Sequence, residues 1–403
     1  MRVRCLSFHA GYRCGNSGVC CSSGWAIPVE PESERRIGDG LRSGRLRLSD
    51  YDDTMDLGRV PGTHGGIAWS RPAANRIHGT RVVLRTDSAG GCIFLDTRKS
   101  RVCVVHQQLG EGALPSACRH FPRVVTLTPL GVSVTLSHYC PTAASLLFGR
   151  SADPRIVPNP LAFPSSWPFE GLDATAALPP FLRPGVLMSW PALERWEEHA
   201  VATFAEESLT PEAALAELAA DAEAARAWAP AEGDFDAFFA RLLAARADRR
   251  VRAGAVRGFE GAAAAAWDLA AAAVPDPALR PTSPEAARDP SAMALVDAGW
   301  ATLAWPVRRW LASKAFASWT ALQGRGLRTT VRALALALAV LRAEAARGCA
   351  RRGEPLAAEG LREAIRRADL LLQQLVDPQA LAERLSAVER GGGGVLASGS
   401  FRA

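Results

Sequence analysis

Cysteine is distributed very unevenly along this chain of 403 residues. Eight of the nine cysteines lie at or before position 140, and only Cys349 lies beyond it. The neighbours of the eight are mainly Gly, Ser, Arg and His, which are not the neighbours of a thiol packed in an apolar core. The distribution therefore predicts a separate cysteine-rich domain over residues 1–150. The eight are Cys5, Cys14, Cys20, Cys21, Cys92, Cys103, Cys118 and Cys140.

Three explanations of the cluster compete: a disulfide framework, buried structural thiols and metal ligands. The first residues contain no continuous apolar stretch of the kind that forms a signal peptide, which predicts a cytoplasmic protein with reduced thiols. Glycines at 11, 15, 18 and 24 allow the backbone around Cys14, Cys20 and Cys21 to turn toward one centre. These features favour metal ligation, either by zinc or by an iron–sulfur cluster such as [4Fe–4S].

The choice between zinc and iron–sulfur stays open at this point. No cysteine pair has the C-x₂-C spacing of a zinc finger, while Cys140-Pro141 repeats a feature of ferredoxin clusters. Four histidines lie within four residues of a cysteine, and we expect them to be hydrogen-bond partners rather than ligands. They are His9, His106, His120 and His138.

The rest of the chain predicts a different architecture. Residues 151–184 are rich in proline and predict an extended connector on the protein surface, held by Trp167 and Phe169. Residues 185–390 show apolar residues at spacings of three and four, which predict a helical domain with Thr210 and Asp234 as helix N-caps. Residues 391–403 predict a frayed tail. Within the first domain, 81–86 and 91–96 predict one hairpin, 124–137 a second, and 114–121 a short helical turn. The fold class is therefore α+β.

Charge and hydropathy limit the partners. The formal net charge is +6, but the arginines are scattered and the only lysines are Lys99 and Lys314. Nucleic-acid binding needs clustered positive charge, so this class of function is not expected. The longest apolar stretch, around residues 333–341, is too short to span a membrane.

Four segments carry a resemblance to a known family: "CGNSGVCC", "CIFLDTRKSRVC", "LPSACRHFPRVV" and "LSHYCPTAASLLF". Together they resemble the bacterial cysteine-cluster family described as a zinc- or iron-chelating domain, over about residues 1–150. The most similar branch contains flagellin lysine N-methylases. The resemblance implies that all eight N-terminal cysteines are metal ligands.

Two functions follow. The first is a metal-binding protein whose helical region provides a surface for a protein partner. The second, implied by the resemblance, is a protein lysine N-methylase that uses S-adenosylmethionine and a metal cluster. No G-x-G-x-G nucleotide motif supports the second function. Arg119 and Arg123 would either hold a cofactor carboxylate or offset the negative charge of the thiolates.

Overall fold

The chain folds into two compact units, each described here by itself. The structure, a computed structural model, describes residues 1–15, 17–22, 27–47, 69–70, 83–84, 91–96, 102–149, 153–247 and 262–387. Unit 1 comprises Met1–Tyr12, Arg123–Tyr139 and Ala143–Ala403, and unit 2 comprises Arg13–Pro122 and Cys140–Thr142. These units do not coincide with the segments expected from composition, because residues at the start of the chain pair with a hairpin that begins at Arg123.

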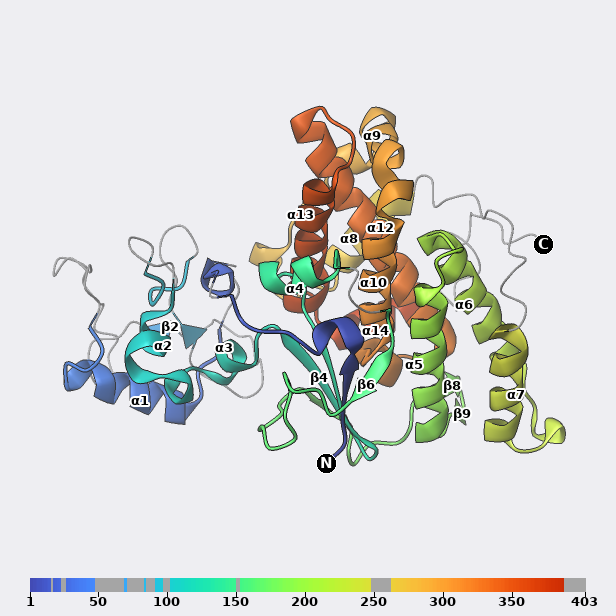
Figure 1. Ribbon diagram of the computed structural model, residues 1–403, viewed down its shortest axis with the longest axis horizontal. Helices are drawn as coiled ribbons and strands as arrows, with labels where there is room; N and C mark the ends of the chain where they lie inside the picture. Colours follow the sequence, from blue (N-terminus) through green and yellow to red (C-terminus); the bar gives the residue numbers. More distant parts are fainter. Residues whose placement is uncertain are drawn as a thin grey trace. The chain divides into compact units, whose positions relative to one another are not determined.

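A five-stranded sheet in the order β6-β1-β5-β4-β7 lies beside the helices of unit 1 (Figure 1). β4 and β5 form the expected hairpin, with Pro129 and Leu130 in the turn. β1 pairs in parallel with β5, so that Cys5 lies opposite Val134. The strands are β1 (Val3–Leu6), β4 (Arg123–Thr128), β5 (Gly131–Leu136), β6 (Ile156–Pro158) and β7 (Leu172–Asp173).

The proline-rich segment contributes both edge strands of this sheet, β6 beside β1 and β7 beside β4. Edge positions suit this segment, because proline has no N–H to donate to an inner strand pair. Phe169 is buried, and its ring meets the ring of Trp167 edge-on at 5.9 Å. The segment also forms a small hairpin of β8 (Phe181–Arg183) and β9 (Val186–Leu187).

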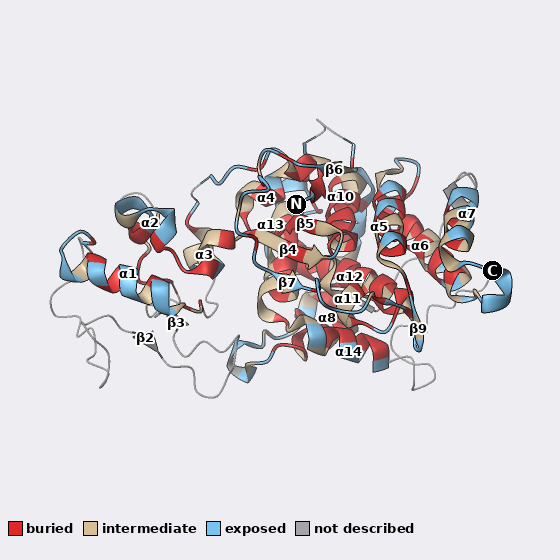
Figure 2. Ribbon diagram, turned by 90° about the horizontal axis from the view of Figure 1, so that it is seen from below, coloured by how far each residue is buried: buried red, intermediate tan, exposed pale blue. Residues whose placement is uncertain are grey.

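The described residues after position 189 are mainly helical, as the sequence predicts, and their apolar faces form one core. α12 is the long central helix, and Figure 2 shows it buried along much of its length. Two predicted N-caps are confirmed, because Thr210 accepts from the N–H of Ala213 and Asp234 from that of Ala237. The helices are α4 (Pro141–Leu146), α5 (Trp190–Ala205), α6 (Pro211–Arg226), α7 (Phe235–Ala247), α8 (Ala262–Ala271), α9 (Pro290–Trp300), α10 (Ala304–Ala315), α11 (Trp319–Gln323), α12 (Leu327–Arg352), α13 (Ala358–Asp369), the π-helical turn Leu370–Leu375 and α14 (Pro378–Ala387).

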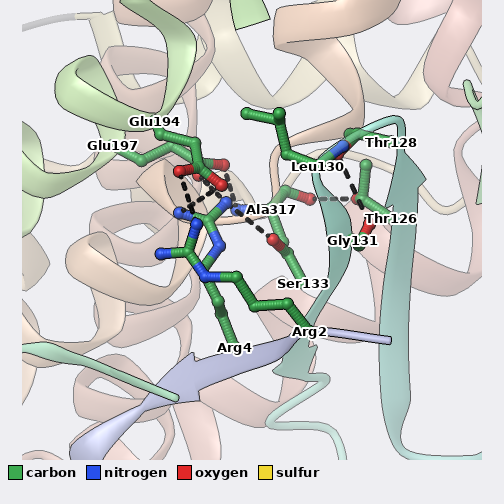
Figure 3. A network of polar contacts seen from close by, with 10 residues as sticks. All are labelled: Arg2, Arg4, Thr126, Thr128, Leu130, Gly131, Ser133, Glu194, Glu197 and Ala317. Carbon is green, nitrogen blue, oxygen red and sulfur yellow. Dashed lines mark hydrogen bonds and ion pairs between the residues drawn. The ribbon is translucent and has the colours of Figure 1, made fainter. Parts of the chain in front are cut away.

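A buried polar network ties the sheet to α5 and to the loop between α10 and α11 (Figure 3). The guanidinium of Arg4 on β1 contacts Glu197 at 2.9 Å and Ser133 on β5 at 2.9 Å. Glu197 also accepts from the N–H of Ala317, whose carbonyl accepts from Thr126 on β4. Ala317 has a φ of 56°, which is uncommon for a residue with a Cβ. This network fixes the helices against one face of the sheet.

Unit 2 has shorter elements around its own apolar cluster, which includes Ile37, Phe94 and Val105. Among its described residues, β2 and β3 form a two-stranded antiparallel pair. The elements are the 3₁₀ turn η2 (Val19–Ser22), α1 (Pro31–Arg42), β2 (Trp69–Ser70), β3 (Val83–Leu84), α2 (Val104–Leu109), the 3₁₀ turn Glu111–Ala113 and α3 (Ser116–His120).

One predicted hairpin is wrong. Val83–Leu84 pairs with Trp69–Ser70, and residues 91–96 form a turn rather than a strand. The carbonyl oxygen of Phe94 accepts from the N–H of Val104, the first residue of α2. A short apolar run of this kind is compatible with a strand or a buried turn, and periodicity does not separate the two. The short helix around Cys118 is confirmed as α3, while the tail over 391–403 lies outside the described residues.

Candidate metal centre

Three cysteines of unit 2 form a chain of neighbouring thiols. Cys20 and Cys21 share the turn η2, and their sulfur atoms lie 3.9 Å apart. The thiol of Cys21 also hydrogen-bonds to Cys103, which directly precedes α2.

Backbone hydrogen bonds hold together the segments that carry these thiols. The N–H of Cys92 donates to the carbonyl of Cys21 at 2.6 Å. Leu95 and Cys103 form an isolated antiparallel bridge, and Val104 donates to the carbonyl of Phe94 at 2.9 Å. The turn at 91–96 therefore brings the segments around Cys21 and Cys103 to the same place.

Cys92 and Cys118 extend the cluster to five cysteines. Cys92 is buried in the apolar core of unit 2, and Cys118 packs against that core. Burial raises the pKa of Cys118 well above its ordinary value, and the nearby charges of Cys92, Cys103 and Cys20 raise it further. These are electrostatic neighbours, so all five thiols share one environment.

The environment favours a thiolate at Cys103. A hydrogen bond from the Cys21 thiol lowers the pKa of Cys103 to about 7, against the effect of burial. The backbone N–H groups of Val105 and His106, at the start of α2, add to this lowering. Cys21 donates to Cys20 as well, which lowers the pKa of Cys20 and raises that of Cys21. Thiolates are the form that binds metal ions.

Cys14 and Cys140 also belong to unit 2. The loop of Cys14 packs on the segment that contains Cys140, because a Cβ added at Gly15 would lie 2.7 Å from Oγ1 of Thr142. A side chain at position 15 would require the hydroxyl of Thr142 to move. Seven of the eight predicted ligands thus lie in one unit, and in all seven the sulfur is a thiol rather than part of a disulfide.

Cys5 lies in unit 1, on the buried strand β1. Its thiol lies 3.3 Å from the carbonyl oxygen of Leu6, and burial raises its pKa to about 12. This placement does not test its predicted role as a ligand. Cys349, the one cysteine beyond position 140, is fully buried on α12.

The histidines near cysteines are divided between the units. His106 is exposed on α2, and His120 is buried on α3, both in unit 2. His9 and His138 lie in unit 1, where their Nε2 atoms are 3.1 Å apart and Nδ1 of His138 lies 3.2 Å from Asp369. Sequence spacing gave no sign of this pairing, because Asp369 is distant in the chain.

The two predicted cofactor-binding arginines also lie in different units. Arg119 is on α3 of unit 2, and Arg123 begins β4 of unit 1. The guanidinium of Arg123 lies 3.8 Å from the centre of the Trp167 ring. Sequence reasoning missed one acidic neighbour of the thiols, Glu30, which accepts from the N–H of Ser116 at 3.0 Å and faces Cys118. In the sequence, the only indication that Glu30 has a structural role was its position directly before Pro31, at the start of a helix.

The side chains of the cysteine cluster provide part of a metal site but not a complete one. Over the described residues, no group of three or more Cys, His, Asp or Glu side chains is already arranged around one point as a complete metal site. The pair of Cys20 and Cys21 has suitable spacing, since two sulfurs at about 2.3 Å from a tetrahedral zinc are about 3.8 Å apart. A complete site therefore requires rotation of further thiols toward this pair.

The described part of the chain contains no helix that is both long and apolar enough to cross a membrane. Comparison with known proteins identifies no relative: no family model matches the chain, and no curated protein or solved structure matches it. The fold and the site thus define an α+β protein with a helical C-terminal region and a cluster of thiols in a second unit.

Proposed function

We propose that unit 2 is a metal-binding module in which thiolates of the cysteine cluster hold the ion. The observation that carries the proposal is the 3.9 Å distance between the sulfurs of Cys20 and Cys21, close to the spacing of two zinc ligands. Cys103, with a pKa of about 7, supplies a third sulfur that ionises near neutral pH. Cys92 and Cys118 are the nearest candidates for the fourth position.

Zinc is the first choice of metal and iron–sulfur the second. Sulfurs of adjacent residues at this distance suit two ligands of the same ion. In a [4Fe–4S] cluster each thiolate binds a different iron atom, so its sulfurs lie farther apart than two ligands of one ion. The bound ion would order a unit whose described elements are short, because ligand binding contributes to folding free energy.

The test is metal analysis of protein purified without oxygen, together with its visible spectrum. We expect stoichiometric zinc and a colourless protein, whereas iron with acid-labile sulfide would establish the second choice. Cys21→Ser should lose the metal, and Cys349→Ser, a buried thiol of unit 1, should retain it. Protein without bound metal, or equal metal content in both variants, would contradict the proposal.

Protein lysine methylation with S-adenosylmethionine stays a prediction from the family resemblance. It would place the cluster at the active centre and use the helical region to recognise a protein substrate. The metal module does not depend on it, and a transfer assay with labelled S-adenosylmethionine and flagellin tests it separately.

A further inference from the structure

Backbone contacts hold Cys21 and Cys103 of unit 2 close to each other. The carbonyl oxygen of Cys21 accepts from the N–H of Cys92, in the turn at 91–96. Within the same turn, Leu95 forms an isolated antiparallel bridge with Cys103. The thiol of Cys21 hydrogen-bonds to the sulfur of Cys103 across this arrangement. Two sulfurs from distant parts of the sequence are therefore held within reach of one another.

Cys20 also hydrogen-bonds to Cys21 but is less suited to form a disulfide with it. Their sulfurs lie 3.9 Å apart. The Cα atoms of adjacent residues, however, are only about 3.8 Å apart across a trans peptide. Disulfides usually join Cα atoms that are about 4.4–6.8 Å apart, so a bond between adjacent cysteines strains the backbone. Cys103 lies on a separate segment and is not subject to this limit.

Exposure separates Cys103 from the other cysteine of the turn. Cys21 and Cys103 are both partly exposed, whereas Cys92 is buried in the apolar core of unit 2. Oxidation of cysteine by peroxides follows exposure to solvent, because the oxidant has to reach the sulfur. Of the cysteines whose backbone or thiol contacts Cys21, Cys103 thus combines exposure with a position on a separate segment.

We propose that unit 2 is a redox switch, in which a peroxide joins Cys21 and Cys103 in a disulfide and thereby releases the metal ion. The release step rests on the proposed metal-binding function, and the disulfide does not. The switch lies in the sulfur atoms, since zinc itself has no redox chemistry in proteins.

The reaction takes two steps. In the metal-bound form both sulfurs are thiolates, because the ion has replaced their protons. One thiolate attacks hydrogen peroxide, whose O–O bond breaks, and this forms a sulfenic acid and releases hydroxide. The other thiolate attacks the sulfenic sulfur, so that the S–S bond forms, the S–O bond breaks and a second hydroxide leaves. The two sulfurs lose two electrons, the peroxide gains them, and two protons from solvent convert the hydroxides to water.

The disulfide takes two thiolates away from the proposed site. Cys20 is then the only one of the three foremost ligands that can still bind the ion as a thiolate. Reduction by an added thiol breaks the S–S bond through a mixed disulfide and restores both ligands. The metal content of unit 2 therefore follows the redox state of its surroundings.

The experiment oxidises full-length protein, as purified without oxygen, with a small excess of hydrogen peroxide. Released zinc is measured with a chromogenic chelator, and the disulfide is located by fragmenting the cross-linked tryptic peptides in a mass spectrometer. We expect a Cys21–Cys103 link, release of the bound zinc in step with it, and recovery of both thiols and zinc binding after reduction. Zinc released without this link, or oxidation that joins another pair, would overturn the switch. Protein without zinc before oxidation would instead overturn the proposed function and the release step.

Two serine variants identify the pair. Each removes one proposed ligand, so the yield of cross-linked peptide is compared rather than the zinc content. Cys103→Ser should lower the yield of a link to Cys21 at least about ten-fold, since no other exposed thiol on a separate segment is hydrogen-bonded to Cys21. Cys20→Ser is the matched control and should keep the link, although its sulfur also lies beside Cys21. Equal yields in the two variants would contradict the proposal.

Discussion

The backbone N–H of Cys92 donates a 2.6 Å hydrogen bond to the carbonyl oxygen of Cys21, although the two residues are far apart in sequence. This bond joins two of the segments that carry the thiols of unit 2. If the thiols hold a metal, its removal should loosen this bond first. We expect a chelator to increase hydrogen exchange at the amide of Cys92 and to leave the sheet of unit 1 unchanged. Equal exchange with and without chelator would argue that the metal does not organise unit 2.

Cys5 provides a second prediction, because the family resemblance makes it a ligand while the structure packs it in the sheet of unit 1. We expect Cys5→Ala to keep its full metal content and to lower the free energy of unfolding by about 1 kcal/mol, as for a small core truncation. Metal analysis and urea unfolding check both parts. Loss of metal on the scale of Cys21→Ser would restore Cys5 to the ligand set.

A third prediction concerns the dependence of stability on pH. Burial lowers the pKa of His9 well below 6.5, and the charges of His138, Lys314 and Arg309 lower it further. His138 in turn contacts the carboxylate of Asp369. The unfolded chain therefore binds more protons than the folded chain below pH 6.5, so stability falls as the pH decreases.

The expected slope from His9 is about 1.4 kcal/mol per pH unit below the unfolded pKa. His9→Gln removes this titration while leaving a hydrogen-bonding group beside His138. Urea unfolding between neutral and mildly acidic pH should show a smaller loss for the variant than for the parent protein. A parallel loss in both would mean that His9 is not the group responsible.

The ion pair of Arg4 and Glu197 provides a fourth prediction (Figure 3). Both side chains are nearly fully buried, and Glu197→Gln leaves the Arg4 charge without this partner. Arg4 keeps its ion pair with Glu194 at 3.2 Å, so we expect a loss of about 1–3 kcal/mol in the free energy of unfolding. Glu223→Gln, which breaks the more exposed pair with Arg328, should cost about 1 kcal/mol or less. Similar losses in the two variants would show that burial does not increase the contribution of the Arg4–Glu197 pair to the free energy of unfolding.

Much of the helical region followed from the sequence, because its helices carry local signals. Thr210 and Asp234 were predicted as N-caps and both accept the expected backbone hydrogen bonds. The hairpin of β4 and β5 was also predicted, since alternating residues flank a Pro-Leu-Gly turn. Signals of this kind are contained within a few residues, so they do not depend on the rest of the fold.

Features that depend on distant residues were not predictable. The pairing of β1 with β5 places the first residues of the chain in unit 1, and no local pattern near Cys5 indicates it. The turn at 91–96 is satisfied by hydrogen bonds to other segments, and its apolar sequence suggested a strand. The contact between Lys314 and Asp369 likewise joins α10 to α13 and has no local signature.

X-ray absorption at the zinc edge of the purified protein tests the central claim most directly. The account predicts a shell of sulfur neighbours at about 2.3 Å with tetrahedral coordination. In Cys21→Ser this shell should be lost, and in Cys349→Ser it should be unchanged. Zinc surrounded only by nitrogen and oxygen at about 2.0–2.2 Å, without sulfur, would contradict the assignment of the cysteine cluster as a metal centre.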